Sequence, residues 1–460
     1  MQLQGYVDYL DIKRVSGWVI DLDNPKEVVR VRIMLDDRLL GIVPADRERS
    51  DLLAAGIPRG NCMFVFRFAQ PLAASDLPFI QAVPENSEQP LSGSLHDFQR
   101  YCAAKFFPYH ETFEYSWWDT RCFQTETDML SLEGDMHLPG GASHPVFSLN
   151  GGEPVEVKLG LPTHGRARDF WYVENSPMLG YQATVAVDKS EPFNDVWLRY
   201  QDSSGQERIR PIVRFPSDRS RERLIPPPEM LTRVIGPTPR PYGSFIVGGA
   251  TDVLLIEFLL EKYTRRKASE FGSVLDWGCG CGRTTWALAE MLPDANLIGI
   301  DIDEPNLNYA RSIVPGANFE LSGLYPPLRL RNSTGDLIFS QSVFTHLSET
   351  AQDLWLAELD RILAPGGVAI ISLQLEVTSL ARSFDVEAIQ TYQAFGIEDY
   401  IRDRALGGVI SDEDYYRSTF HTTDYVKKRW QKVFHIAGIE PGFVGGHQDA
   451  VICLKKDGPR

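Results

Sequence analysis

The stretch "VLDWGCGCGRTT", from Val274 to Thr285, carries most of the information about the C-terminal half of the chain. An apolar run containing Asp276 leads directly into three glycines within five positions. Glycine weakens helices and strands, but it permits positive φ angles and lets another group come close to the backbone. The stretch therefore predicts a strand, a sharp turn against which a ligand rests, and the start of a helix.

Strand-like and helix-like segments alternate from about residue 250 to the end of the chain. "NLIGID", "GDLIFSQ" and "GGVAIISLQ" have the composition of buried strands, and "EPNLNYARSI" and "TAQDLWLAELDRIL" have helical periodicity. This alternation indicates βαβ units, and hence a parallel sheet covered by helices. The last two strand-like runs, "IEPGFVGG" and "DAVICLKK", predict a closing hairpin at the sheet edge.

The first half of the chain has the pattern of short antiparallel strands. The segments 28–46 and 181–190 alternate apolar and polar residues, and hairpin signals such as Asn150-Gly151-Gly152 separate the strand-like runs. One helix-like insertion, at 50–60, interrupts them. We expect an all-β architecture built from two small sandwich-like domains.

A proline-rich segment separates the two halves. Residues 225–243 contain six prolines and two glycines, a density typical of a stiff, extended connector. The predicted organisation is multidomain: a β-sandwich accessory module at 1–97, a second one at 98–224, a linker at 225–244 and a doubly wound, seven-stranded α/β domain at 245–460.

The composition disfavours several broad classes. The apolar and charged fractions of the 460 residues are those of a globular protein, and the formal net charge of −16 disfavours nucleic-acid or anionic-membrane partners. No apolar run approaches the roughly 20 residues that span a bilayer, and the N-terminal stretch has no secretory h-region. Six cysteines without zinc-like spacing favour a reduced chain. We expect a cytoplasmic protein without a membrane span.

Two ligand classes fit the glycine turn. A nicotinamide or flavin dinucleotide fold expects G-x-G-x-x-G, but Gly282 comes one residue early and Arg283 follows where a glycine should face the pyrophosphate. S-adenosylmethionine (SAM) carries no phosphate, so its amino-acid part and ribose can rest against this loop. Asp301, which ends the next strand-like run, can accept hydrogen bonds from both ribose hydroxyls of either ligand.

Four segments together resemble the motifs of class I SAM-dependent methyltransferases in order and spacing: "VLDWGCGCGR", "GIDID", "GDLIFSQSVFTHL" and "LDRILAPGG". The resemblance covers roughly residues 245–457, and the set is specific although a lone glycine triplet is a weak signal. It implies a Rossmann-like fold, SAM as the cofactor and methyl transfer as the activity.

The resemblance also implies roles for individual residues. The three glycines of the loop line the methionine and ribose part of SAM, Asp276 orients the loop or holds the ammonium through a water, and Asp301 binds the ribose. Ile302 packs on the adenine, and the absence of an acid after the third strand leaves adenine to backbone and apolar contacts. The expected cofactor-binding residues are Asp276, Gly278, Cys279, Gly280, Gly282, Asp301, Ile302, Ser322, Gly323, Leu324, Ser340 and Gln341, with Gly248 and Gly249 approaching from the front.

An oxygen nucleophile usually needs a base, and three residues are candidate catalytic groups. His346 lies just beyond the fourth strand, where it acts as a base or merely caps the next segment. His447 and Asp449 are two residues apart on a strand and therefore share a face. They form either an oriented base or a structural hydrogen bond that closes the sheet edge.

The acceptor side is expected in the insertion before the last helix, at 412–425. Class I enzymes commonly build acceptor recognition there, so Tyr415, Tyr416, Arg417 and His421 are candidate substrate-binding residues, and packing of a lid is the alternative for each. Cys279 and Cys281 are small packing residues rather than redox groups. The aromatic stretches 115–123 and 168–177 are core contacts or sugar-stacking platforms.

The N-terminal half resembles, more loosely, small β modules that accompany glycosyltransferases and methyltransferases of bacterial surface-glycan pathways. The matching pieces include Gly17-Trp18, the turn at Asp36-Asp37-Arg38 and the 51–60 insertion. The resemblance implies O-methylation of a sugar or glycan, with possible docking of glycan-pathway enzymes on the modules. The alternatives are another small acceptor, such as a lipid, polyketide or peptide, and a glycan-binding scaffold with a vestigial SAM fold.

Overall fold

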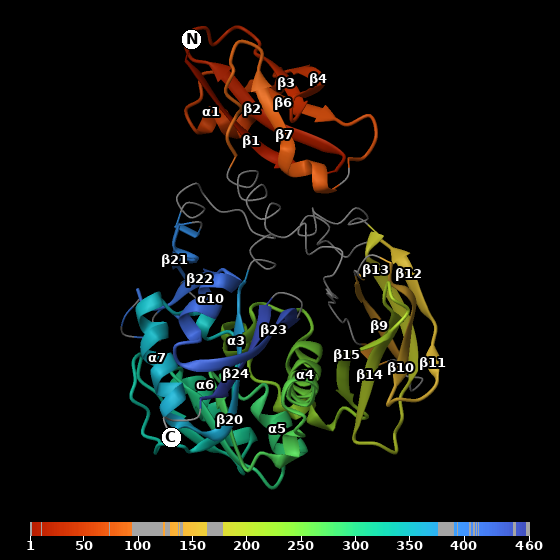
Figure 1. Ribbon diagram of the computed structural model, residues 1–460, viewed down its shortest axis with the longest axis vertical. Coiled ribbons are helices and arrows are strands. Elements are labelled where there is room, and N and C mark those ends of the chain that lie inside the picture. Colours follow the sequence, from red (N-terminus) through yellow and green to blue (C-terminus); the bar gives the residue numbers. More distant parts are fainter. Residues whose placement is uncertain are drawn as a thin grey trace. The chain divides into compact units, whose positions relative to one another are not determined.

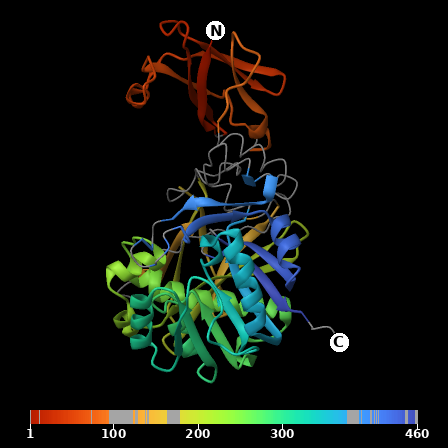
Figure 2. The same ribbon diagram turned by 90° about the vertical axis from the view of Figure 1, so that its left-hand side faces the viewer.

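The computed structural model divides the chain into two compact units (Figure 1 and Figure 2). Unit 1 comprises Met1–Phe113, Pro162–Leu179 and Leu380–Thr391, and unit 2 comprises Glu114–Leu161, Gly180–Ser379 and Tyr392–Arg460. The structure describes residues 2–10, 12–72, 74–93, 123–124, 129–136, 138, 141–162, 178–375, 391–392, 394–403, 406–407, 410, 412, 414–444 and 448–456.

The described part of unit 1 is an all-β module with two antiparallel sheets. One sheet has the strand order β1-β2-β6-β5 and the other has the order β4-β3-β7. The ring of Phe66 in β6 lies against Gly41 of β4, so the two sheets face each other. The elements are β1 (Leu3–Leu10), β2 (Arg14–Asp21), β3 (Arg30–Leu35), β4 (Arg38–Pro44), β5 (Arg47–Glu48), helix α1 (Ser50–Ala54), β6 (Asn61–Arg67), the 3₁₀ segment η1 (Ala74–Phe79) and β7 (Ile80–Pro84).

Unit 2 begins with a second all-β block of two antiparallel sheets, ordered β12-β13-β9-β8 and β11-β10-β14-β15. Buried residues of both sheets, such as Leu132, Tyr181 and Phe215, belong to one hydrophobic cluster. Asn150 and Gly151 take positive φ angles in the turn between β10 and β11, which confirms that hairpin. The strands are β8 (Phe123–Gln124), β9 (Met129–Asp135), β10 (Ser143–Leu149), β11 (Pro154–Val155), β12 (Val157–Leu161), β13 (Gly180–Ala186), β14 (Phe193–Gln201) and β15 (Glu207–Pro216).

The C-terminal half contains the predicted seven-stranded sheet, ordered β18-β17-β16-β19-β20-β24-β23. Neighbouring strands from β18 to β20 pair in parallel, and β24 pairs antiparallel with both β20 and β23. The closing hairpin at the edge is therefore confirmed. The strands are β16 (Ser273–Trp277), β17 (Asn296–Asp301), β18 (Asn318–Leu321), β19 (Gly335–Ser340), β20 (Leu363–Leu373), β23 (Phe434–Val444) and β24 (Gln448–Lys455).

Helices cover both faces of this sheet because alternate residues of its buried strands point to opposite sides. Val274 packs into a cluster with α4 and α5, whereas Leu275 packs into another with α7 and α10. A two-stranded sheet, β21 with β22, lies in the insertion before α10. The elements are α4 (Gly248–Thr264), η5 (Ala268–Glu270), α5 (Thr285–Met291), α6 (Glu304–Ile313), η6 (Phe344–His346), α7 (Glu349–Ile362), β21 (Ile397–Arg402), β22 (Arg417–His421) and α10 (Thr423–Trp430).

One continuous helical stretch, Tyr242–Thr264, is long and apolar enough to cross a membrane by length and composition. It consists of the π-helical turn η4 (Tyr242–Val247) followed by α4. In its most apolar window 67% of the residues are buried inside the structure, and Val253, Ile256 and Leu260 are buried in the core of the α/β domain. Its apolar character is thus explained by packing, because a core helix is hydrophobic for the same reason as a membrane helix.

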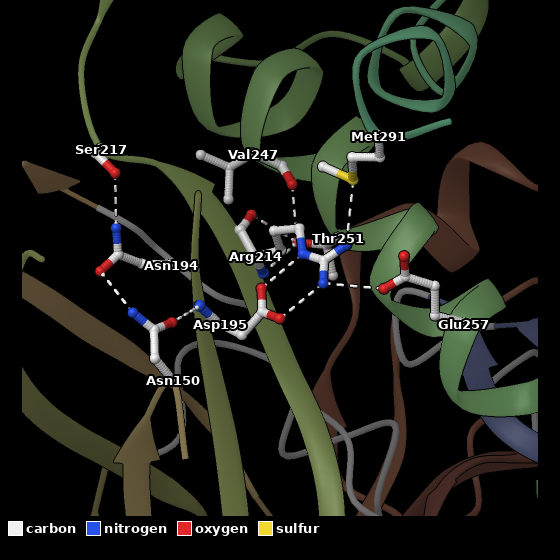
Figure 3. A network of polar contacts seen from close by, with 9 residues as sticks. All are labelled: Asn150, Asn194, Asp195, Arg214, Ser217, Val247, Thr251, Glu257 and Met291. Atoms are coloured by element: carbon white, nitrogen blue, oxygen red, sulfur yellow. Dashed lines mark hydrogen bonds and ion pairs between the residues drawn. The ribbon is translucent and has the colours of Figure 1, made fainter. Parts of the chain in front are cut away.

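A network of polar contacts joins the second β block to α4 (Figure 3). Arg214 of β15 binds both carboxylate oxygens of Asp195, at 2.6 and 2.7 Å, and also binds Glu257 of α4 at 2.9 Å. The hydroxyl group of Thr251 donates to the Val247 carbonyl and accepts a hydrogen bond from the backbone N–H of Arg214. The β block and the α/β domain therefore pack through a charged, partly buried contact.

The proline-rich segment differs from the predicted extended connector. Its prolines open a helix, α3 (Pro228–Ile235), after the short 3₁₀ segment η3 (Ser220–Leu224). Proline at the first helical position loses no intrahelical hydrogen bond, and its fixed φ angle suits a helix. Gly236 then ends α3 with a φ angle of 74°. The proline density therefore marks a helix start rather than a stiff linker.

Candidate functional site

A cavity of about 380 Å³ lies at the carboxyl ends of β16, β17 and β19. Ligands bind at this edge in doubly wound sheets, and the volume lies in the range of small-molecule sites. The cavity is lined by the glycine loop, by the ends of β17 and β19, by α3 and by residues of the 403–416 segment. The predicted site residues that line it are Asp276, Gly278, Cys279, Gly280, Asp301, Ile302, Ser322, Gln341, His346, Tyr415 and Tyr416.

The glycine loop has the backbone that its composition predicts. Gly278, Gly280 and Gly282 have φ angles of 84°, 52° and 85°, which residues with a Cβ rarely adopt. A Cβ on Gly280 would lie 2.8 Å from the Val234 side chain. Gly282 does not line the cavity. A Cβ added to it would lie only 3.1 Å from the side chain of Ala310 in α6. Two of the glycines therefore shape the cavity, and the third lets α6 approach the loop.

Asp276 ties the end of β16 to the start of α5. Its carboxylate accepts a hydrogen bond of 2.6 Å from the hydroxyl group of Thr285. Burial raises the pKa of Asp276 to about 7, and the nearby Asp252 carboxylate raises it further against the effect of the Thr285 bond. This bond connects the two ends of the glycine loop, and the role that the resemblance implies for Asp276 stays a prediction.

An arginine that sequence reasoning did not assign to the site lies beside Asp276. Arg283 donates to Gln341 Oε1 at 2.6 Å and forms an ion pair of 2.8 Å with Asp252 of α4. Asp252 also accepts a hydrogen bond of 2.8 Å from the Thr284 hydroxyl group. Asp252 is 31 residues upstream of Arg283 inside an apolar helix, and no local pattern in the sequence connects the two.

Asp301 ends β17 and faces the cavity. Its Oδ2 accepts a hydrogen bond of 2.7 Å from the Gly280 N–H, and its Oδ1 accepts one of 2.8 Å from the Asp303 N–H. Burial raises the pKa of Asp301 to about 6, although these backbone bonds lower it. Each carboxylate oxygen can accept a second hydrogen bond. The group is thus fixed in place and still able to bind two hydroxyls.

Helix α3 forms a wall of the cavity that the sequence analysis did not anticipate. Arg233 binds Asp303 Oδ2 at 2.7 Å, and Val234 packs against the glycine loop. Asp303 is 2% exposed and caps α6, where its Oδ1 accepts the Asn306 N–H. The cap was detectable from "DEPNLN", since Asp before Glu-Pro is a typical helix start. The bond to Arg233 was not, because the two residues are far apart in the chain.

The expected adenine-binding residues are only partly at the cavity. Ile302 and Ser322 line it, together with Trp277 and Trp355. Leu324 instead packs on the core beneath, and its carbonyl accepts a hydrogen bond of 3.2 Å from Trp355 Nε1. Gly323 does not line the cavity either. The apolar part of the lining here therefore comes from Ile302 and from the two largely buried tryptophans rather than from Leu324.

Four further residues expected near the cofactor have other positions or character. Ser340 is fully buried below the cavity floor. Gly248 and Gly249 begin α4 and lie against Arg283, so they do not open onto the cavity. Cys279 lines the cavity, but burial raises the pKa of its thiol well above the usual value, which keeps it protonated and unreactive.

His346 lines the cavity next to residues of the 403–417 segment. Its Nδ1 is 2.9 Å from the Arg417 carbonyl and 3.5 Å from Asp403 Oδ2. Its ring stacks on Tyr416 at a centroid distance of 4.2 Å and an interplanar angle of 10°. The carbonyl of Arg417 thus contacts the site, whereas its guanidinium donates to the Asp399 and Asp414 carbonyls.

The geometry of Asp449 does not support the prediction that His447 and Asp449 form a catalytic base. Asp449 is fully buried, and its two oxygens accept hydrogen bonds from the backbone N–H groups of Leu375 and Gly442. Asp449 therefore has a structural role and does not line the cavity: it satisfies one backbone N–H after β20 and one in the irregular part of β23. His447 lies outside the described residues.

Of the four predicted acceptor residues, His421 is corrected. His421 is fully buried, its Nε2 contacts Gln352 Oε1 at 2.9 Å, and burial lowers its pKa to about 3. It is a neutral core residue. Tyr415 does line the cavity, where its hydroxyl accepts a hydrogen bond of 3.0 Å from Trp355 Nε1. The aromatic stretches 115–123 and 168–177 fall almost wholly outside the described residues.

Within the described residues, no cluster of His, Cys, Asp or Glu side chains has the geometry to hold a metal ion. The described cysteines Cys62, Cys279, Cys281 and Cys453 are free and buried.

Comparison with known proteins identifies this region. Residues 274–367 match a family model described as a methyltransferase domain. A trans-aconitate 2-methyltransferase from Variovorax paradoxus is 34% identical over 115 residues, which are 25% of this chain and 42% of that protein. One from Sinorhizobium fredii is 36% identical over 105 residues, or 22% of this chain and 38% of that protein. The chain thus spans less than half the length of these relatives.

The solved structures that the comparison returns include a SAM-dependent methyltransferase from Methanosarcina mazei. It is 18% identical, covers 43% of this chain and 96% of that chain, and has a TM-score of 0.33. Another is a Burkholderia thailandensis 1,6-didemethyltoxoflavin-N1-methyltransferase with bound S-adenosylhomocysteine, which is 18% identical, covers 45% of this chain and 80% of that chain, and has a TM-score of 0.31.

Proposed function

We propose that the C-terminal half of the chain, in which residues 274–367 match a methyltransferase domain, is a class I SAM-dependent methyltransferase that transfers a methyl group from SAM to a hydroxyl group of a sugar or glycan. The proposal that SAM is the cofactor rests on one observation: the glycine loop is hydrogen-bonded to Asp301 at the ends of two neighbouring parallel strands. The loop offers close backbone approach, and the carboxylate offers two acceptors for a ribose.

The residues around the cavity fit SAM by their chemistry. Gly278 and Gly280 line the cavity with backbone, because a Cβ at either position would collide with Val343 or Val234. Asp301 suits the two ribose hydroxyls, and Ile302 offers an apolar surface for adenine. The bound donor supplies an electrophilic methyl group on a positively charged sulfur. The carboxylates of the cavity favour that charge, and both arginines at its wall already bind carboxylates, which disfavours a pyrophosphate.

The charge of the cavity supports an uncharged acceptor. The described lining residues include the carboxyl groups of Asp276, Asp301, Asp303 and Asp403, whereas its guanidinium groups, Arg233 and Arg283, are paired with carboxylates. A carboxylate acceptor, such as the trans-aconitate of the relatives described above, would be repelled by these carboxylates and would find both lining guanidinium groups already paired. A hydroxyl acceptor carries no such penalty, but it must lose a proton as the methyl group arrives.

The choice of a sugar among hydroxyl acceptors rests on the N-terminal modules, which resemble those of bacterial surface-glycan pathways. Other hydroxyl-bearing small acceptors, such as a lipid, a polyketide or a peptide, are the alternative. On this proposal the β modules bind the saccharide or dock a glycan-pathway enzyme. The alternative hypothesis, a glycan-binding scaffold with a vestigial SAM fold, predicts that SAM binds but that no acceptor is labelled.

Calorimetry and a labelled-methyl assay test the proposal in two steps. We expect SAM, but not NAD, to bind the full chain, and Asp301→Asn to weaken SAM binding by at least about tenfold, the loss of one or two hydrogen bonds to a charged group. Asp294→Asn, the same change at an exposed aspartate, is the matched control. Label from SAM should then enter saccharides and not trans-aconitate. Tight binding of NAD would contradict the proposal, and so would transfer of the labelled methyl group to trans-aconitate alone.

A further inference from the structure

We propose that His346 accepts the proton of the acceptor hydroxyl and that Asp403 is a positioning residue for its imidazole ring, an inference that rests on the proposed function. His346 ends η6 just after β19, Asp403 follows β21 and Tyr416 precedes β22. All three line the same cavity as the glycine loop. Residues from three separate elements therefore converge where the acceptor has to enter.

The hydrogen bond to the Arg417 carbonyl fixes which nitrogen of His346 carries the proton. A carbonyl oxygen only accepts, so Nδ1, at 2.9 Å from it, must be the N–H of the neutral ring. The lone pair of the neutral ring then lies on Nε2. This is the tautomer that a general base needs, with its orientation set by a backbone group.

Asp403 supplies the charge that stabilises the protonated ring. Its Oδ2 lies 3.5 Å from Nδ1, and the side chains of His346 and Asp403 are only 19% and 28% exposed. An opposite charge at this distance favours the imidazolium form. Because the Nδ1 proton is shared with the Arg417 carbonyl, Asp403 acts through its charge and through the ring orientation rather than by taking the proton.

Tyr416 holds the other face of the ring. It stacks on His346 with nearly parallel planes, and burial together with the Asp403 and Asp301 carboxylates raises the pKa of its hydroxyl. The tyrosine therefore stays neutral and adds no competing charge. Of the other charged groups near this cluster, the Arg417 guanidinium binds two backbone carbonyls and the Asp399 carboxylate accepts the Glu349 N–H.

The methyl transfer needs no protein group other than these residues to account for the proton and the leaving group. The acceptor oxygen forms a bond to the methyl carbon as the carbon–sulfur bond breaks toward sulfur, and the hydroxyl proton passes to Nε2 of His346. The products are a methyl ether, S-adenosylhomocysteine and an imidazolium that Asp403 stabilises. No oxidant or metal is required.

An NMR titration of the ligand-free protein tests the His346–Asp403 coupling without any turnover. His346 is assigned among the nine histidines by the signal that disappears in His346→Gln. We expect Asp403→Asn to lower the pKa of His346 by about half a unit to one unit, because an anion that favours the charged ring is removed. Asp414→Asn is the matched control, since that carboxylate binds Arg402 instead. If the pKa of His346 is the same in Asp403→Asn and in the wild type, Asp403 is not a positioning residue.

Kinetics test the role of His346 as the base. His346→Gln should reduce methyl transfer by about 100-fold or more while the Kd for SAM stays within about twofold. Asp403→Asn should lower kcat and move the acidic limb of the pH profile to lower pH. Added imidazole should partly restore His346→Ala, which separates a lost base from a misfolded chain. If wild type neither binds SAM nor labels an acceptor, the proposed function fails; if His346→Gln retains wild-type kcat, this inference alone is overturned.

Discussion

Asp301 lies where the glycine loop, the end of β17 and the N-terminus of α6 meet, so its ionisation affects all three. Two backbone N–H groups hold its carboxylate in position before any ligand arrives. The energetic cost of this arrangement is burial, which raises the pKa of Asp301 to about 6 and that of Asp276 to about 7. Preorganised acceptors of this kind are typical of binding sites, where perturbed pKa values cluster.

Affinity for SAM should therefore depend on pH in a predictable direction. Above about pH 7 both carboxyl groups are ionised and attract the sulfonium and the ammonium, whereas below about pH 6 they are protonated and lose that attraction. We expect the Kd measured by calorimetry to rise about tenfold between pH 8 and pH 5, and Asp301→Asn to flatten the lower part of this dependence. A Kd independent of pH would contradict the assigned roles.

The same pKa values fix the sign of a stability effect in the ligand-free protein. A carboxyl group whose pKa is raised on folding binds more protons in the folded state than in the unfolded state, between its unfolded value near 4 and its folded value. These two groups therefore lower the free energy of unfolding as the pH rises from about 4 to about 7. Bound SAM should reverse part of this loss, because it favours the ionised forms.

Helix α3 is the element whose position matters most for the cavity and whose own packing is weakest. Of its eight residues Leu231 is buried, and the partly buried Val234 and Ile235 pack against the same core cluster. The Arg233–Asp303 ion pair adds a polar attachment. A helix of this length is not stable without such contacts. The ion pair is accordingly expected to hold the cavity wall in place.

Arg233→Met should loosen this wall while leaving the α/β core intact. It removes the cation beside Asp303, which is almost fully buried, at a cost of about 1–2 kcal/mol. We expect faster hydrogen exchange in residues 228–236 and a five- to tenfold weaker affinity for SAM, about 1–1.4 kcal/mol, with unchanged exchange in α4. Arg311→Met on the exposed side of α6 is the control. Unaltered exchange in α3 would show that the ion pair does not hold it.

The two halves of unit 2 pack through charged groups that also have partners within their own half. Arg214 of the β block sits between Asp195 of its own sheet and Glu257 of α4 (Figure 3). A second contact pairs Arg210 with Glu440 of β23 at 3.2 Å, where Lys262 and Tyr263 also bind Glu440. Trp197 and Phe258 pack between these two contacts. The second β block is therefore part of the folding unit of the α/β domain.

Breaking the Arg214 contact should destabilise the whole of unit 2. Arg214→Met leaves Asp195 and Glu257 without their cation, so we expect the free energy of unfolding to fall by about 2 kcal/mol. Arg208→Met on the same strand removes a more exposed pair and should cost less than about 0.5 kcal/mol. Chemical denaturation of both variants measures the difference, and the Kd for SAM should be the same in each. A loss confined to the β block would show that the two halves fold independently.

Much of the C-terminal architecture was predictable because its signals are local. The alternating strands and helices, the hairpin of β23 and β24 and the positive φ angles of Gly278 and Gly280 follow from periodicity and from the conformational freedom of glycine. The proline-rich segment misled the prediction because proline opens a helix as readily as it extends a linker. For Asp449 and His421 the sequence left a functional and a structural role open, and burial, which no short pattern reveals, decides for the structural one.

From its amino-acid order alone, this chain specifies a parallel α/β sheet, a glycine turn at its carboxyl edge and an acid at the end of the next strand, since each depends on residues that are neighbours in sequence. The wall formed by α3, the pairing of Arg283 with Asp252 and the orientation of His346 by the Arg417 carbonyl, 71 residues away, became visible only after folding. These contacts join distant segments, and their formation depends on how the core packs rather than on any local preference.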